Sequence, residues 1–250
     1  DRVLCLFPME PPIYAAHRVD ARFIGHPLAD AIALTPDRTA ARAALGEAAT
    51  APLLALLPGS RLGEIHGMLP DFGEAARRLA RDIPGLRVLV PAANEKCRAA
   101  IEQVLAGNPL FRVLDGQAQQ IMIASDTVLL ASGTAALEAM LCKRPMVIGH
   151  RISPLTYRIV RWFGLLKSEF VSLPNVLAGQ ALVPELLQDA CTPEHLHAAL
   201  LRWFRDAVAV AALQPRFLEI HQSLRLNASQ RAADAVAELL HRVITQSLPV

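Results

Sequence analysis

The sequence predicts a doubly wound α/β fold, in which one parallel sheet carries helices on both faces and a helical tail follows. From Leu53 onward, short apolar runs alternate regularly with helical patterns, and this alternation is typical of a parallel sheet covered on both faces. The 250 residues are 53% hydrophobic and 19% charged, so the chain can bury one large core or two smaller ones. From Pro193 to the end, the pattern is helical only.

Each expected element is an apolar or helical run that ends at proline, glycine or a capping residue. The expected strands of the sheet are Leu53–Leu57, Leu86–Val90, Phe111–Leu114, Thr127–Ala131, Pro145–Ile148 and Phe170–Leu173. Short strands are also expected at Val3–Phe7 and Arg22–Gly25. The expected helices are Arg38–Leu45, Glu64–Arg81, Glu95–Ala106, Gln117–Ala124, Thr134–Cys142, Pro154–Phe163, Pro193–Arg205, Gln214–Leu224 and Ala228–Thr245.

Composition argues against several classes of function. The net charge of +2 offers no global field for nucleic acid. No apolar run is long enough for a membrane-spanning helix, and no signal peptide is expected. The four cysteines are far apart in the sequence and are expected to be reduced, buried thiols of a cytoplasmic protein. His195 and His197 are two apart on a predicted helix and point different ways, and His26, His66 and His150 are isolated in the sequence. No D-x-D pair occurs, so no metal is expected. Missing G-x-G-x-x-G and P-loop motifs argue against NAD, FAD and P-loop ATP chemistry.

Two loops that follow predicted strands have the residues of a phosphate site. Ser132, Gly133 and Thr134 separate a buried strand from a helix, so backbone N–H groups and the positive end of a helix dipole meet there. Glu138 lies one helical turn after Thr134, where a carboxylate could accept hydrogen bonds from sugar hydroxyls. An ordinary strand-to-helix turn remains an equal alternative for this stretch.

The second loop, Gly59-Ser60-Arg61, follows the first strand of the sheet. Gly59 allows a tight turn, Ser60 adds a hydroxyl, and Arg61 offers a planar fork for phosphate oxygens. A surface arginine is usually only solvated, but ligands of parallel sheets bind at the carboxyl ends of the strands, where both loops are expected. Two such loops on one edge indicate a diphosphate.

Two further stretches leave alternatives open. Asn175 follows a proline at the predicted end of the last strand, where it could hydrogen-bond a ligand or simply form a turn. Residues 151–167 mix basic and aromatic side chains, which suits either an anionic membrane surface or a helix packed on the sheet. The residues considered for membrane or acceptor contact are Arg151, Arg158, Arg161 and Trp162.

Four blocks taken together resemble lipid-A-disaccharide synthase, in order and in spacing. They are Phe23–Asp30 (FIGHPLAD), Leu56–Ile65 (LLPGSRLGEI), Ala131–Glu138 (ASGTAALE) and Ser172–Gly179 (SLPNVLAG). The resemblance implies a two-domain B-type glycosyltransferase with its active site between the domains. Such enzymes are inverting, metal-independent hexosyltransferases without a cofactor, which join UDP-2,3-diacylglucosamine to 2,3-diacylglucosamine 1-phosphate and release UDP. They lie peripherally on the cytoplasmic face of the inner membrane of Gram-negative bacteria.

The resemblance also assigns roles within this chain. Arg61 and the Ser132-Gly133-Thr134 loop would bind the diphosphate, Glu138 the ribose hydroxyls, and Asn175 would help to position the donor, with Gly59 and Ser60 shaping the site. Residues 1–30 would be a remnant of the acceptor domain and linker, residues 31–225 the UDP-sugar domain, and residues 226–250 a helix that crosses back. The general base would belong to the absent domain, so this chain would bind UDP without turnover, and the last helix could serve a homodimer. The alternatives are a UDP-N-acetylglucosamine 2-epimerase and a non-catalytic nucleotide-binding module.

Overall fold

The structure is a computed structural model that describes residues 2–131, 133–151 and 170–247, with the backbone alone for 242–247. The predicted helix Pro154–Phe163 therefore lies outside the described residues. The chain divides into two compact units, one of residues 35–217 and one of residues 1–34 with 218–250. The domain boundaries drawn from the sequence remain a prediction.

The larger unit contains a six-stranded, all-parallel sheet of order β5-β4-β3-β6-β7-β8. In this order, β4 and β5 lie on one side of the β3–β6 pair, and β7 and β8 lie on the other. The boundary between β3 and β6 is therefore the topological switch point of a doubly wound fold. The predicted fold class is confirmed. The strands are β3 (Leu53–Leu57), β4 (Arg87–Ala92), β5 (Phe111–Asp115), β6 (Thr127–Ala131), β7 (Met146–His150) and β8 (Glu185–Leu187).

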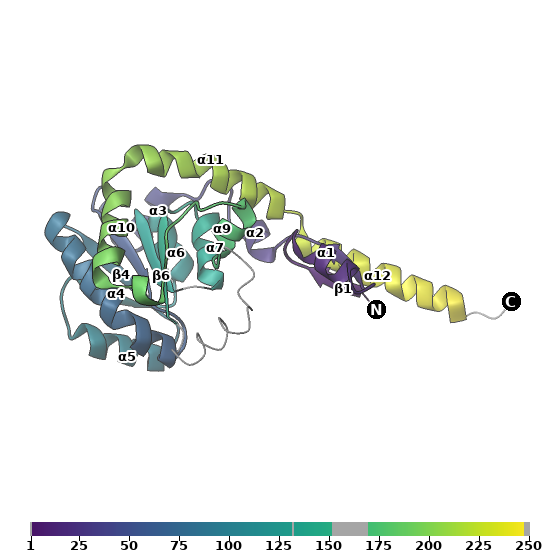
Figure 1. Cartoon of the computed structure of the whole chain (residues 1–250), viewed down its shortest axis with the longest axis horizontal. Coiled ribbons are helices and arrows are strands. Elements are labelled where there is room, and N and C mark those ends of the chain that lie inside the picture. The colour runs from purple at the N-terminus through teal and green to yellow at the C-terminus, as the bar shows by residue number, and fades with distance from the viewer. Residues whose placement is uncertain (1, 132, 152–169, 248–250) are drawn as a thin grey trace. The chain divides into compact units, whose positions relative to one another are not determined.

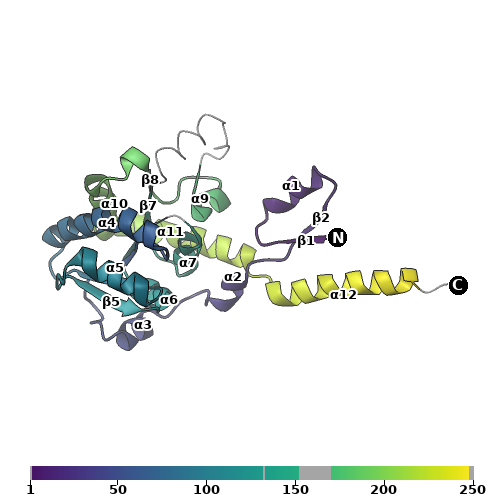
Figure 2. The same ribbon diagram turned by 90° about the horizontal axis from the view of Figure 1, so that it is seen from below.

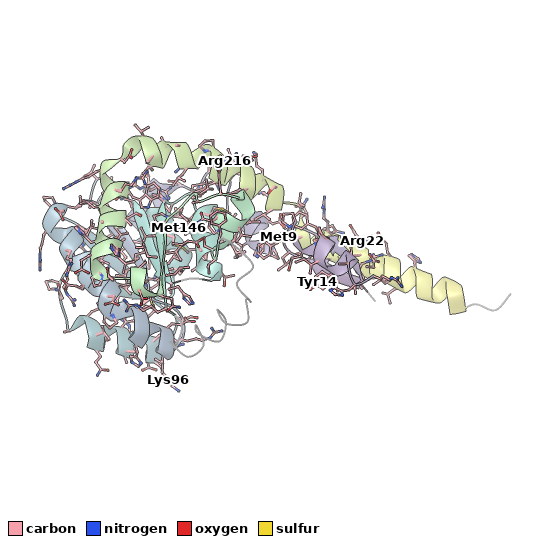
Figure 3. The ribbon with its side chains drawn as sticks, in the orientation of Figure 1. Met9, Tyr14, Arg22, Lys96, Met146 and Arg216 are labelled. Carbon is pink, nitrogen blue, oxygen red and sulfur yellow. The ribbon has the colours of Figure 1, made fainter. Side chains whose placement is uncertain are left out.

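Helices cover both faces of this sheet (Figures 1 and 2). One face carries α4 (Leu62–Asp82), α5 (Glu95–Leu105) and α10 (Pro193–Arg205). The other carries α3 (Arg38–Ala44), α6 (Ala118–Ala124), α7 (Thr134–Leu141) and α9 (Leu173–Ala178). Because helices lie on both sides, every residue of β3 and β6 is buried. Figure 3 shows Met146 inside the unit and Lys96 pointing outward from α5.

The sixth strand of the sheet is not where the sequence predicted it. Phe170–Leu173 forms no strand; Leu173 begins α9 with Pro174 in its first turn, and the sixth strand is β8. Proline has the backbone angle of a first helical turn and lacks the N–H that a ladder requires, so this stretch favours a helix start. The backbone N–H groups of Val171 and Ser172 donate instead to the Glu185 carboxylate, at 2.9 and 3.0 Å.

Arg42 holds α3 against the beginning of the sheet. Its side chain is 2% exposed and donates to the Asp126 carboxylate at 3.0 Å. Asp126 also accepts from the backbone N–H of Leu53, at 2.8 Å, so the ion pair joins α3 to the first residue of β3. Further bonds of the guanidinium reach the carbonyl groups of Ala48, Ala49, Ala51 and Ala124.

The smaller unit is built on two parallel strands, β1 (Arg2–Cys5) and β2 (Asp20–Phe23). It also contains α1 (Glu10–Ala15), α2 (Pro27–Ala31), α12 (Ala228–Ser247) and the end of α11 (Ala207–Leu224). Arg2 and Arg22 both donate to Glu238 of α12, at 3.0 and 2.8 Å. Asp30 accepts from the first N–H groups of α12, and the helix is thereby fixed to the rest of the unit.

Candidate functional site

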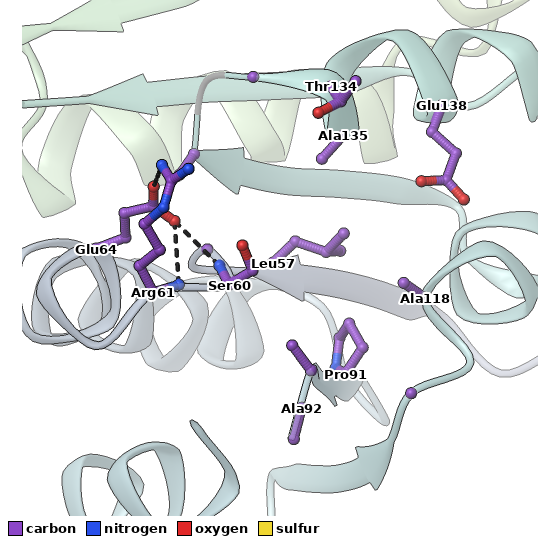
Figure 4. A pocket seen from close by; sticks show the side chains of 15 residues that line it. Leu57, Ser60, Arg61, Glu64, Pro91, Ala92, Ala118, Thr134, Ala135 and Glu138 are labelled. Carbon is purple, nitrogen blue, oxygen red and sulfur yellow. Dashed lines mark hydrogen bonds and ion pairs between the residues drawn. The ribbon is translucent and has the colours of Figure 1, made fainter. Parts of the chain in front are cut away.

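A pocket of about 360 Å³ opens at the switch point of the larger sheet (Figure 4). It lies where β3 and β6 end, which is where ligands of open α/β sheets bind. Its volume is at the lower end of the range for small-molecule sites. The lining residues are Leu57, Gly59, Ser60, Arg61, Glu64, Pro91, Ala92, Ala93, Gly116, Ala118, Ala131, Gly133, Thr134, Ala135 and Glu138.

The loop after β3 forms one wall and is held from two sides. The Glu64 carboxylate accepts from the backbone N–H of Ser60 at 3.0 Å and from the Arg61 guanidinium at 3.2 Å. On the other side, the thiol of Cys97 in α5 donates to the Ser60 carbonyl at 3.4 Å. Gly59 has φ +124°, and a Cβ there would lie 2.4 Å from a Glu64 carboxylate oxygen, so only glycine fits under this carboxylate.

The opposite wall is the beginning of α7. Gly133 is the N-cap residue of this helix, with φ +139°, and as a glycine it offers no side chain to cap the first turn. The backbone N–H of Ala136 donates to the Gly133 carbonyl at 3.1 Å, whereas those of Thr134 and Ala135, as the first two of the helix, have no carbonyl within it to donate to and can serve a ligand. Thr134, Ala135 and Glu138 line the pocket from this helix (Figure 4).

Glu138 is a half-buried carboxylate directed into the pocket (Figure 4). Burial raises the pKa of this carboxyl above its usual value, because the ionised form loses hydration. A carboxylate that has given up hydration gains most from new donors, such as the hydroxyl groups of a sugar.

The structure brings most of the predicted site residues together. The pocket is lined by Gly59, Ser60, Arg61, Gly133, Thr134 and Glu138. Figure 4 shows Ser60 and Arg61 on one side of it and Thr134 and Glu138 on the other. Ser132 lies outside the described residues, and so do Arg158, Arg161 and Trp162. Arg151 is described, and its guanidinium bonds within the chain to Asp71 and to the backbone carbonyl groups of Gln188 and Cys191.

Asn175 does not line this pocket. Its predicted place at the end of a strand is wrong, because Phe170–Leu173 is not a strand and Asn175 lies within α9. Its amide is 1% exposed and fully used inside the chain. The amide nitrogen donates to the Val183 carbonyl at 2.9 Å and to Glu185 at 2.8 Å. The amide oxygen accepts from the N–H groups of Leu182 at 2.8 Å and Val183 at 3.0 Å. Asn175 therefore joins α9, which packs on α7, to the approach to β8.

Sequence reasoning assigned no role to Glu64, nor to the wall formed by Pro91, Ala92, Gly116 and Ala118. Both Glu64 and the apolar wall could have been predicted from their positions in the sequence. Glu64 comes three residues after Arg61 at a helix start, the spacing at which a carboxylate returns to the N-terminal backbone. The apolar wall follows β4 and β5, at the same carboxyl edge as the predicted loops.

His26 and the four cysteines, reactive side chains also considered from the sequence, lie in the interior of the described part of the chain. His26 is buried, and its Nδ1 accepts from the Leu28 N–H to cap α2. The four cysteines are free and buried, as the sequence predicted. Within the described residues, no three His, Cys, Asp or Glu side chains gather as a metal site would require. No described helix is both long and apolar enough to cross a bilayer.

The sheet order and the helices on both faces match one half of the B-type glycosyltransferase fold. The pneumococcal O-GlcNAc transferase GtfA, solved with UDP and GlcNAc, matches with TM-score 0.60 and 13% identity over 96% of this chain and 46% of that one. A putative UDP-N-acetylglucosamine 2-epimerase from Listeria monocytogenes matches with TM-score 0.62 and 14% identity, over 97% of this chain and 60% of that one. At these identities the likeness shows the fold alone.

Comparison of the amino-acid sequence, rather than of the fold, identifies the family of this chain. Residues 1–239 match the family described as lipid-A-disaccharide synthetase, and the chain belongs to it. The lipid-A-disaccharide synthase of Xanthomonas axonopodis pv. citri (strain 306) is 59% identical over 244 residues, 96% of this chain and 56% of that protein. That of Xylella fastidiosa (strain M12) is 53% identical over 246 residues, 97% of this chain and 64% of that protein. The chain thus spans somewhat over half the length of these curated relatives, and the resemblance seen in four motifs is confirmed.

Proposed function

We propose that this chain is the donor-binding part of a lipid-A-disaccharide synthase, and that the pocket between β3 and β6 holds the UDP portion of UDP-2,3-diacylglucosamine. The whole enzyme would join this donor to 2,3-diacylglucosamine 1-phosphate and release UDP. The observation that carries the proposal is the meeting of the Arg61 loop, the start of α7 after Gly133, and Glu138 in one pocket.

In this proposal, each wall of the pocket binds a different part of UDP. Arg61 and the first N–H groups of α7 would bind the diphosphate and stabilise the negative charge that develops on the departing UDP. Glu138 would accept hydrogen bonds from the ribose hydroxyl groups. Asn175 would act at a distance, since its four bonds hold α9 and α9 packs against α7.

We further propose that the smaller unit belongs to the acceptor side of the whole protein. An isolated pair of parallel strands such as β1 and β2 is rarely stable, because parallel sheets are normally larger and covered on both faces. In this proposal, residues 1–30 are the end of the acceptor domain and the linker, and residues 226–250 return to it. The general base would come from the part of the relatives' length that this chain does not span.

Binding of UDP to the chain is the first test. Calorimetric titration should give a measurable affinity, which Arg61→Ala and Glu138→Ala each weaken by about 1–3 kcal/mol, the usual cost of a lost charged hydrogen bond. Arg81→Ala, an exposed arginine at the other end of α4, is the matched control and should leave the affinity unchanged. A folded chain that binds no UDP would contradict the proposal.

Peripheral contact with an anionic membrane is proposed for residues 151–167. Replacing Arg158 and Arg161 with Glu should then weaken binding to anionic liposomes, since each basic side chain near such a surface contributes about 1 kcal/mol. The same change at the exposed Arg202 and Arg205 of α10 serves as control. Unchanged liposome binding by the first variant would refute the contact.

A further inference from the structure

The Glu64 carboxylate accepts from the Arg61 guanidinium, which the proposed function assigns to the diphosphate, and from the backbone N–H groups of the same loop. One carboxylate oxygen lies 3.0 Å from the backbone nitrogen of Ser60 and 3.4 Å from that of Arg61. The other oxygen lies 3.2 Å from the Arg61 guanidinium. Backbone N–H groups and an arginine fork around one anionic group are the arrangement in which proteins hold a phosphate. The carboxylate therefore sits as an anion in the mouth of this loop (Figure 4).

The loop is shaped around this carboxylate. Gly59 lies directly beneath it, with a virtual Cβ 2.4 Å from the carboxylate oxygen and 2.5 Å from the Glu64 Cβ. The side chain of Glu64 is also 35% exposed, so it can leave the loop toward solvent without repacking the core. The Glu64 carboxylate thus packs closely against Gly59 on one side, and on the other side it is open to solvent.

The charges of the pocket disfavour a state in which the Glu64 carboxylate and a diphosphate both lie against this loop. Among the described lining residues, Arg61 carries the one fixed positive charge, whereas Glu64 and Glu138 are both acidic. A diphosphate adds further negative charge beside the same donors, and like charges that share one set of donors repel each other. Each N–H can also serve only one acceptor well.

We propose that Glu64 is a resident anion of the empty pocket, which a diphosphate displaces when it binds. This inference rests on the proposed function and deepens it. The exchange keeps the loop donors satisfied in both states, so that the loop is formed before the ligand arrives. It also favours ligands that bring at least one phosphate, because only an anion repays the release of Glu64.

The experiment compares wild type with Glu64→Gln by calorimetry, using uridine, UDP and inorganic pyrophosphate as ligands. Glutamine can still accept from the Arg61 N–H at the start of α4, so the change removes charge while it keeps a cap. UDP and pyrophosphate should each bind about tenfold more tightly to the variant, and uridine should not change. Glu74→Gln, in the same helix and outside the pocket, removes the same charge and should have no effect.

A second measurement uses the wild-type chain alone. Carbon NMR of the glutamate carboxyl groups should show the Glu64 resonance move as pyrophosphate is added, while that of Glu74 stays in place. An unmoved Glu64 resonance with ligand bound would overturn the inference.

The outcomes also separate this inference from the proposed function. Wild type that binds UDP, with equal or weaker binding by Glu64→Gln, overturns the displacement and leaves the donor site standing. Pyrophosphate binding strengthened by Glu64→Gln, with no UDP binding by either chain, supports displacement and contradicts the UDP site. Failure of both chains to bind UDP or pyrophosphate contradicts both.

Discussion

Asn175 provides a direct test of structural support against ligand contact. Its side chain makes four hydrogen bonds of 2.8–3.0 Å while 1% exposed. A protein hydrogen bond contributes about 1 kcal/mol net, and a buried partner left unsatisfied costs more. Asn175→Ala should therefore lower the free energy of unfolding by about 4 kcal/mol, a large share of the ~5–15 kcal/mol of a typical protein.

Asn175→Asp sharpens the test, because aspartate keeps both acceptor bonds but turns the donor into a second oxygen. That oxygen would face the Val183 carbonyl and the Glu185 carboxylate, so the variant should be at least as unstable as Asn175→Ala at pH 7. Protonation restores one donor, so the deficit should shrink as the pH falls toward about 4.

Urea denaturation followed by circular dichroism measures both variants. Asn108→Ala is the matched control, since the Asn108 side chain accepts from the Leu110 N–H at 3.0 Å, and the loss of this bond should cost about 1 kcal/mol. A loss of less than 1 kcal/mol for Asn175→Ala, together with strongly weakened UDP binding, would refute the structural assignment and favour direct ligand contact.

Three further predictions concern the larger unit. Arg42→Met removes the buried partner of the Asp126 carboxylate, which keeps its ion pair with Arg38, and also removes the donor of several backbone carbonyl groups; it should cost about 3 kcal/mol in urea denaturation, and a cost below 1 kcal/mol would contradict the structural role of Arg42. Burial raises the pKa of Glu138, so its ionised form opposes folding above that pKa; Glu138→Gln should raise Tm by a few degrees at pH 7 and by nothing near pH 4, and an equal gain at both pH values would be inconsistent. Gly59→Ala combines φ +124° with a 2.4 Å contact and should destabilise by about 1–3 kcal/mol and weaken UDP binding, whereas Gly107→Ala, at φ +65° in open space, should cost about 1 kcal/mol and leave binding intact.

The elements that the sequence predicted well are those whose own residues decide them. Leu53–Leu57 and Thr127–Ala131 are strands with the predicted bounds, because continuous apolar runs must be buried on both faces. Pro193–Arg205 is likewise the predicted helix, since the Thr192 side chain caps it and proline suits its first turn. In these cases, local preference and burial agree.

The sixth strand shows where local preference was not enough. Glu185–Leu187 is three residues long and half-buried, and it is a strand because β7 offers it a free edge. Phe170–Leu173 looked more like a strand by composition, yet the Glu185 side chain satisfies its N–H groups. Pairing at a sheet edge depends on a neighbour distant in the chain, which composition does not record.

The sequence by itself determined the doubly wound fold and the two loops of the pocket, because strand ends of a parallel sheet gather at one edge whatever the details of packing. The family resemblance followed from the same residues. The spacing of Glu64 from Arg61 indicates a return to the helix start, but only the tertiary structure decided that this carboxylate bonds both the Ser60 N–H and the Arg61 guanidinium, and that the amide of Asn175 is saturated inside the chain. Hydrogen-bond partners are chosen by distances of a few tenths of an ångström between side chains, which spacing along a sequence does not specify.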